Sequence, residues 1–314
     1  MLNENSLVLC GATIGSNSFE DLVRAANLGG FDAISLMATF YEDALSRGLT
    51  INDMEIILND NGIVIAEVDA LLSWLPGSAP EKQASKYEWE NYSKNEELFF
   101  DMATSLGARS INIAQAWGPQ LPIEEVSEAF SILCEKAIKY DLLISLEFLP
   151  WSGIPNLDSA YEVIKYANQP NGGLMIDTWH HHRSGGSVED LLVIPGNKII
   201  STQINGVLKD KWEDIVQETI SARLLPDEGV NDVIGFIKNL DLIKSKAPIG
   251  VEIFSEELYK LPKEEIGKIT GYSVKKVVDK VGKIHEKKKT ARRENSSHYG
   301  GLTRPGKSRS QALC

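Results

Sequence analysis

Eight short apolar runs, rich in β-branched residues, recur along the chain and alternate with segments of helical patterning. They lie at residues 6–14, 31–37, 63–68, 110–114, 142–148, 174–179, 199–204 and 249–254. Each run is apolar almost throughout, which is typical of strands that are buried on both faces. Strands that alternate with helices in this way predict parallel βα units.

The number of repeating units decides between two parallel architectures. Eight βα units within roughly 250 residues match a closed (β/α)8 barrel. A doubly wound open sheet normally carries a glycine-rich phosphate turn after its first strand, and the segment from Gly11 to Gly15 lacks the required spacing. We therefore predict an α/β protein built as a single-domain (β/α)8 TIM barrel.

Local signals place several of the helices. Ser18 is the predicted N-cap of the first helix, with Glu20 in its first turn. We expect one helical region over residues 41–59, ended by the Asn61-Gly62 pair. A polar and aromatic stretch at residues 71–92 carries no clear helix or strand pattern.

The charge distribution divides the chain into a barrel at residues 1–284 and a tail at residues 285–314. The tail carries eight basic residues against two acidic ones and few large apolar residues, so we expect it to be disordered. It is either a solvated terminus or a partner-binding arm. Since the whole chain has a net charge of −12, the barrel is strongly acidic and is not expected to bind nucleic acid.

Targeting and redox signals favour the cytoplasm. No apolar stretch is long enough to span a membrane, and the N-terminus lacks the basic region of a signal peptide. Cys10, Cys134 and Cys314 are far apart and form no metal-binding spacing and no disulfide framework. We expect a cytoplasmic protein that forms no membrane contacts. Both a monomer and a homo-oligomer are compatible with the sequence.

Four polar residues end the last four apolar runs: Glu147, Asp177, Gln203 and Glu252. In a parallel barrel, the C-terminal ends of the strands meet at the active-site mouth. Three carboxylates buried together are very costly without a cation. An all-oxygen ligand set suits Mg²⁺ or Mn²⁺. We predict that these residues bind one divalent metal ion; the alternative is four separate strand-end groups capped by backbone or paired with Arg.

The runs SLEFLPW, MIDTWHHHRSGG, STQING and GVEIFS resemble the xylose isomerase-like superfamily of barrels, and in particular its sugar phosphate isomerase/epimerase branch. In that superfamily a Glu, an Asp, a His or Gln, and a Glu from the last four strands bind one divalent metal. The resemblance implies the same role here for Glu147, Asp177, Gln203 and Glu252.

Two features set limits on this resemblance. Many relatives have a His ligand followed shortly by an Asp at the end of strand seven, whereas this chain has Gln203 and Asn205. The related DNA-repair endonucleases hold three zinc ions with several scattered His residues. This chain has five His, three of them contiguous and two in the predicted tail, so a trinuclear centre and DNA repair are excluded.

Further residues are expected to contact a substrate: His180, Arg183, Arg223, Glu67 and Trp117. His180 follows Asp177 by three positions, and Arg183 follows by three more. Arg223 would hold a phosphate or carboxylate, or is a surface residue paired with Asp227 or Glu228. Tryptophans after strands three to five suit the apolar face of a sugar or an aromatic ring.

The predicted function is metal-dependent isomerisation or epimerisation of a small sugar-like hydroxy-carbonyl substrate through an enediolate held by the metal. Glu147 and Glu252 are the predicted catalytic residues that remove and return the proton. One alternative is a dehydratase or lyase of the inosose, dehydroshikimate or C-glycoside-cleaving type that uses the same site. A second alternative is a non-catalytic barrel that acts as a binding subunit.

Overall fold

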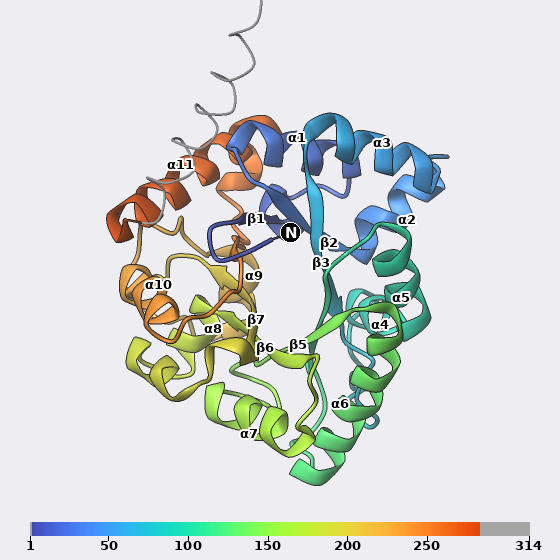
Figure 1. The fold of residues 1–314 in the computed structure, drawn as a ribbon, viewed down its shortest axis with the longest axis vertical. Helices are drawn as coiled ribbons and strands as arrows, with labels where there is room; N and C mark the ends of the chain where they lie inside the picture. The colour runs from blue at the N-terminus through green and yellow to red at the C-terminus, as the bar shows by residue number, and fades with distance from the viewer. Residues whose placement is uncertain (1, 283–314) are drawn as a thin grey trace, which may run out of the picture.

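A computed structural model describes residues 2–282 as a closed barrel of eight parallel strands surrounded by helices (Figure 1). Each strand pairs with its neighbours in chain order, and β1 pairs with β8 to close the barrel. The strands are β1 Leu7–Cys10, β2 Ala33–Met37, β3 Val64–Leu71, β4 Ser110–Ala114, β5 Leu143–Glu147, β6 Gly172–Asp177, β7 Ile199–Ile204 and β8 Ile249–Val251. The predicted fold class is confirmed.

The helices form the outer layer. They are α1 Phe19–Gly29, α2 Ala38–Ser46, α3 Ile51–Asn61, α4 Lys86–Tyr92, α5 Glu96–Ser105, α6 Ile123–Ala137, α7 Leu157–Ala167, α8 Thr178–Arg183, α9 Ile215–Ser221, α10 Val233–Leu242 and α11 Lys263–Val281. The apolar faces of the long helices pack on the strands, and one core cluster spans the barrel and its helices. None of the helices in residues 2–282 is both long and apolar enough to cross a membrane.

Several sequence-based boundaries were right and others were wrong. Ser18 caps α1 as predicted and accepts a hydrogen bond from the Asp21 backbone. The single helix expected at residues 41–59 is wrong: two helices occur because Gly48 adopts a φ of 93° and Thr50 begins α3 with a capping box. The unassigned stretch at residues 71–92 contains α4, which Ser85 caps.

Four strands end before the apolar runs that predicted them. β1 ends at Cys10, β5 at Glu147, β6 at Asp177 and β8 at Val251. An apolar run does not show where a strand stops, because the buried residues that follow a strand are also apolar. The predicted tail at residues 285–314 lies outside the described residues.

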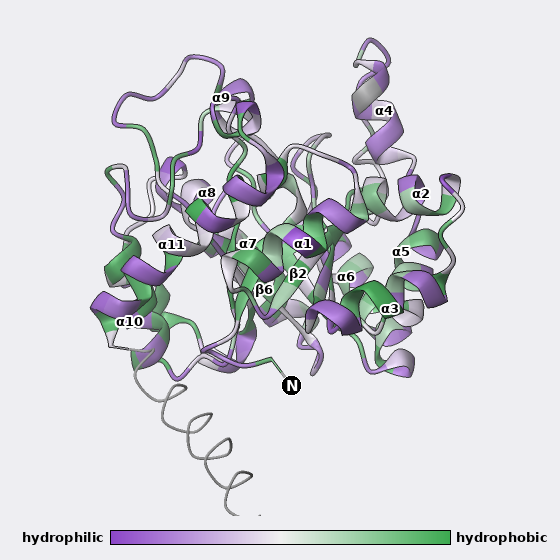
Figure 2. Cartoon of the chain, turned by 90° about the horizontal axis from the view of Figure 1, so that it is seen from above, coloured by the Kyte–Doolittle hydropathy of each residue, from purple (hydrophilic) through white to green (hydrophobic). Residues whose placement is uncertain are grey.

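Two short helices mark the mouth of the barrel. Figure 2 shows α4 and α9 projecting from the same end, with the N-terminus at the opposite end. Since β1 begins near the N-terminus, this is the end at which the strands terminate. The strand-end side chains therefore lie between these two projections.

Helices α1 and α11 pack backbone to backbone at glycines. A Cβ at Gly271 would lie 2.0 Å from the Gly29 carbonyl oxygen, and one at Gly267 would lie 2.2 Å from the Ala25 carbonyl oxygen. Only glycine permits this approach, which fixes α11 across the junction of β8 and β1.

We predict that Gly271→Ala lowers the free energy of unfolding by about 1–3 kcal/mol, because overpacking costs more than the helix-propensity gain of about 1 kcal/mol. Urea denaturation measures the change. The exposed Lys268→Ala on the same helix is the control and should shift the value by no more than about 0.5 kcal/mol. If the free energy of unfolding of Gly271→Ala equals that of the wild type, α1 and α11 accommodate the added methyl group without a loss of stability.

Candidate active site

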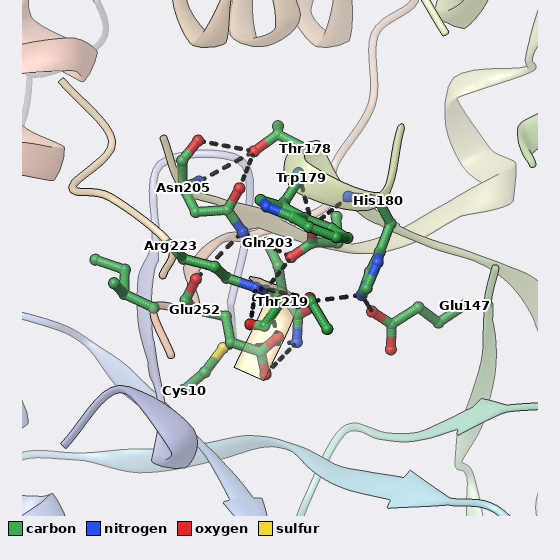
Figure 3. Close-up of polar contacts among 12 residues, drawn as sticks. Cys10, Glu147, Thr178, Trp179, His180, Gln203, Asn205, Thr219, Arg223 and Glu252 are labelled. Atoms are coloured by element: carbon green, nitrogen blue, oxygen red, sulfur yellow. Dashed lines mark hydrogen bonds and ion pairs between the residues drawn. The ribbon is translucent and has the colours of Figure 1, made fainter. Parts of the chain in front are cut away.

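The strand ends bring four polar side chains to the mouth of the barrel. Glu147 and Asp177 are the last residues of β5 and β6, Gln203 is the penultimate residue of β7, and Glu252 directly follows β8. Asp177 and Gln203 are paired across β6 and β7. All four residues are at most 7% exposed. The structure therefore brings the four residues predicted as metal ligands into one buried region, in which Figure 3 labels Glu147, Gln203 and Glu252.

Arg223 lies at the centre of this region. Its Nη1 is 2.9 Å from Asp177 Oδ2 and 2.9 Å from Glu252 Oε2. Its Nε and Nη2 donate to Thr219, and the residue is 2% exposed. Arg223 is thus a buried partner of two candidate ligands, whereas Asp227 pairs with Lys276 instead.

Gln203 connects the carboxylates through its amide. Its Nε2 donates to Glu252 Oε1 and to Asp69 Oδ2, each at 3.2 Å. Its Oε1 is buried and has no hydrogen-bond partner among the described residues. A buried acceptor without a donor is costly, and a cation bound there would satisfy it.

Glu147 and His180 form the other side of the site. Asn112 Nδ2 donates to Glu147 Oε2 at 2.8 Å, and His180 Nε2 lies 3.5 Å from Glu147 Oε1. Arg223 Nη2 lies 3.1 Å from the same histidine nitrogen. One ligand atom each from Glu147, Asp177 and His180 lies within 4.8 Å of the other two. The geometry therefore adds His180 to the residues that are able to reach a metal.

Asp177 holds the local backbone as well as the site. Its Oδ1 accepts hydrogen bonds from the backbone N–H groups of Trp179 and His180 at 2.7 and 2.9 Å, so it caps α8. Its Oδ2 accepts from Asn205 Nδ2 at 2.8 Å in addition to Arg223. Asn205 therefore orients Asp177.

Two acids of β3 enlarge the cluster. Asp69 accepts hydrogen bonds from Ser35, Asn112 and Gln203. Glu67, two residues earlier on the same strand, is 2% exposed and lies inside the barrel beneath Asp69. Asp69 lines the cavity at the mouth, whereas Glu67 does not.

Burial dominates the electrostatics of these groups. It raises the pKa of Glu252 and of Glu67 to about 8, and it raises the pKa of Glu147 well above its usual value, with Asp69 and Glu252 adding repulsion. Burial also lowers the pKa of His180 to about 3, so this imidazole is neutral. Among the described residues that line the cavity, three carboxyl groups (Asp69, Glu147 and Glu252) accompany one guanidinium, that of Arg223. Asp177 pairs with Arg223 just behind the lining, and Glu67 has Arg109 beside it.

This charge excess fits a divalent cation. Carboxylate oxygens and the free amide oxygen of Gln203 are ligands that Mg²⁺ and Mn²⁺ prefer, and His180 adds a nitrogen that Zn²⁺ also accepts. A cation would lower the pKa values of the surrounding carboxyl groups. The donor set is therefore compatible with one bound metal ion.

The remaining predicted contacts have different positions. Trp117 lines the cavity, and its Nε1 donates to Glu88 of α4 at 3.0 Å. Arg183 does not line the cavity: it donates to Glu218 and to the Leu208 carbonyl, which anchors the segment between β7 and α9. Its predicted contact with a substrate stays a prediction.

Sequence reasoning missed Asn112 and Thr219 and left Asp69 out of the site. Asn112 was detectable as a polar residue inside the apolar run at residues 110–114. Thr219 carried no signal, because its relation to Arg223 depends on the turn of α9.

Comparison with known proteins identifies the family. A family model described as xylose isomerase-like TIM barrel matches residues 22–271, from α1 to α11. The chain belongs to this family. The matched span includes all four strand-end residues.

Two curated relatives and one solved structure illustrate the range of the family. An inosose isomerase of Bacillus licheniformis is 31% identical over 166 residues, which cover 50% of this chain and 56% of the relative. A 3-dehydroshikimate dehydratase of Pseudomonas aeruginosa is 23% identical over 244 residues, covering 77% of this chain and 37% of the relative. The chain spans about half the length of the inosose isomerases it matches.

The solved structure is described as the IOLI protein with a binding zinc atom. It has a TM-score of 0.75 and 22% identity, and the match covers 88% of this chain and 99% of that one. This likeness supports the barrel fold.

We predict that Mn²⁺ or Zn²⁺ stabilises the protein, because the ion offsets repulsion among the buried carboxylates. At a metal concentration of about 100 times Kd the gain is about 2.7 kcal/mol, which corresponds to a rise in melting temperature of about 5 °C or more. Differential scanning fluorimetry with and without a chelator measures it.

The matched variants for this test are Glu147→Gln and Glu67→Gln. Glu147→Gln should lose most of the stabilisation by metal, whereas Glu67→Gln should retain it, since Glu147 lines the cavity and Glu67 does not. Equal metal responses in the two variants would contradict the assignment of Glu147.

We predict that Arg223→Met lowers the stability of the metal-free protein and raises its affinity for the metal about tenfold or more. Both effects follow because the substitution removes a positive charge that pairs with Asp177 and Glu252. Calorimetric titration with Mn²⁺ measures the affinity. Arg24→Met, in an exposed ion pair with Glu264, is the control. Weaker metal binding by Arg223→Met would show that the guanidinium supports the metal site.

Proposed function

We propose that the protein is a divalent-metal-dependent enzyme that isomerises or epimerises a sugar-like hydroxy-carbonyl compound. The observation that carries this proposal is the pair of buried carboxyl groups, Glu147 and Glu252, that line one cavity with Asp69 and His180. The cavity has a volume of about 210 Å³. Family membership and the names of the relatives support the same reaction class.

Glu147, Asp177, Gln203 and Glu252 would hold the metal, with His180 as an additional candidate. When bound, the ion supplies a Lewis acid that stabilises negative charge on substrate oxygens. The oxygen-rich ligand set makes Mg²⁺ or Mn²⁺ the proposed ions, and the zinc in the neighbouring solved structure keeps Zn²⁺ in the test.

The two glutamates are suited to proton transfer from different directions. They come from the ends of β5 and β8, which β6 and β7 separate around the barrel. One carboxylate removes a proton from the carbon next to the carbonyl, and the other returns a proton to the same or the neighbouring carbon. Asn112 orients Glu147, and Gln203 and Arg223 orient Glu252.

The neighbouring residues position the substrate and exclude water. His180 is neutral and nearly fully buried, and its Nδ1 has no partner among the described residues. Trp151 packs edge-on against the His180 ring and restricts its movement.

A second reaction remains a candidate because of the dehydratase match, which covers more of this chain than the isomerase match does. Dehydration begins with the same proton removal beside a carbonyl and then expels a hydroxyl group. Glu147 and Glu252 would serve as base and acid in both reactions.

We predict that Glu147→Gln and Glu252→Gln each lower turnover by about 100-fold or more, measured at saturating metal. The proton-transfer role requires an ionisable carboxyl group, and glutamine retains the shape without it. Wild-type protein is incubated in D₂O with candidate ketoses and with 3-dehydroshikimate, and products are followed by mass spectrometry. Solvent deuterium in a product of unchanged composition indicates isomerisation, and loss of water indicates dehydration.

The exposed Glu257→Gln provides the matched control for these variants, because Glu257 pairs only with Lys260 in the described structure. Near-wild-type turnover in both active-site variants on a confirmed substrate would refute the proposed mechanism.

A further inference from the structure

The cavity that contains the carboxyl groups has a polar cluster at one end and is mostly apolar elsewhere, apart from Thr39, Asn91, Lys94 and Thr219. Its polar end consists of Asp69, Glu147, His180, Arg223 and Glu252. Most of the remaining lining is carbon, including Met37, Leu72, Trp117, Trp151, Ile220 and Phe254. A polyhydroxylated substrate needs hydrogen-bond partners along its whole length, and this lining offers few of them.

The two tryptophans present hydrocarbon rather than N–H groups. Trp117 Nε1 donates to Glu88 at 3.0 Å, and Trp151 Nε1 donates to the Ala116 carbonyl at 3.2 Å. Both indole donors are therefore engaged within the protein. What remains for a ligand is the apolar surface of the rings.

The cavity also lacks an unpaired cation among the described residues that line it. Its lysine and arginine side chains are Lys94 and Arg223. Lys94 pairs with Glu42, and Arg223 pairs with Asp177 and Glu252. A phosphate or carboxylate group on the substrate would find no free positive charge and would face several acids.

The available space suits a ring joined to a short polar group. The cavity volume is about 210 Å³, whereas an apolar cavity of about 150 Å³ is enough to hold benzene. The surplus accommodates the two or three carbons of a hydroxy-carbonyl group beside the carboxylates.

We propose that the substrate is an uncharged hydroxy-carbonyl compound that carries an apolar group about the size of an aromatic ring. The ring packs in the apolar part of the cavity lined by Leu72, Trp117 and Ile220, and the oxygens face Glu147 and Glu252. The hydroxy-carbonyl part of this proposal rests on the proposed function. The apolar group rests on the cavity lining alone.

Three probes that share one reactive group test the proposal. Hydroxyacetone carries the hydroxy-carbonyl group alone, 2-hydroxyacetophenone adds a phenyl ring, and dihydroxyacetone phosphate adds a charged group. Binding to the Mn²⁺-loaded protein is measured by calorimetry. We expect the phenyl compound to bind about tenfold more tightly than hydroxyacetone, since it buries an additional ring, and the phosphate to bind no more tightly than hydroxyacetone.

Ile220→Ala and Trp117→Ala locate the ring. Ile220 is 45% exposed, so its truncation should not impair folding. Both variants should reduce the ratio of the affinity for the phenyl compound to the affinity for hydroxyacetone about three-fold or more. Leu192→Ala, at an exposed site that does not line the cavity, is the control and should alter neither value.

The outcomes separate this inference from the proposed function. Metal-dependent binding of all three probes without a phenyl advantage, or with a preference for the phosphate, overturns the substrate class and leaves the hydroxy-carbonyl chemistry standing. Phenol tests the ring by itself. If phenol binds as tightly as 2-hydroxyacetophenone, and both bind without metal, the apolar site is supported and the proposed function is refuted. A phenyl advantage that survives Ile220→Ala and Trp117→Ala also overturns the inference.

Discussion

Five buried carboxyl groups lie close together inside one end of the barrel, and much of the local structure compensates the electrostatic repulsion among them. Like charges this close repel strongly where water is excluded. Arg223 offsets part of the repulsion through Asp177 and Glu252, and raised pKa values remove further negative charge from Glu67 and Glu252. A divalent cation completes the compensation in the proposed holoenzyme. The acids therefore connect the stability of this protein to its proposed chemistry.

The barrel provides the rigidity that such a cluster requires. Asn112 on β4, Gln203 on β7 and Asn205 after β7 each donate a hydrogen bond to an acid on another strand. These amides orient the carboxylates without adding charge. Because parallel strands are fixed at both edges, the hydrogen bonds hold side chains from distant parts of the sequence in one geometry. Asn205 and Gln203, where the chain departs from its relatives' commoner residues, thus have defined partners.

The mouth of the barrel determines what reaches the acids. The elements around it supply mainly apolar side chains, and the two cationic side chains among the described lining residues, Lys94 and Arg223, are already paired. Relatives of this chain are named inosose isomerase and 3-dehydroshikimate dehydratase. In our proposals the conserved fold supplies the strand-end acids, while this chain's own loops supply a cavity for an apolar group.

The sequence by itself determined the barrel and the neighbourhood of Glu147, Asp177, Gln203 and Glu252. Strand periodicity is local, and parallel strands in a closed barrel must end at one mouth. Only the tertiary structure decided which side chains touch. Arg223 reaches Asp177 across 46 positions of sequence, Arg183 turns to Glu218, and Glu67 lies beneath the cavity. The physical reason is that side-chain direction in loops depends on packing between distant segments, which no local pattern encodes.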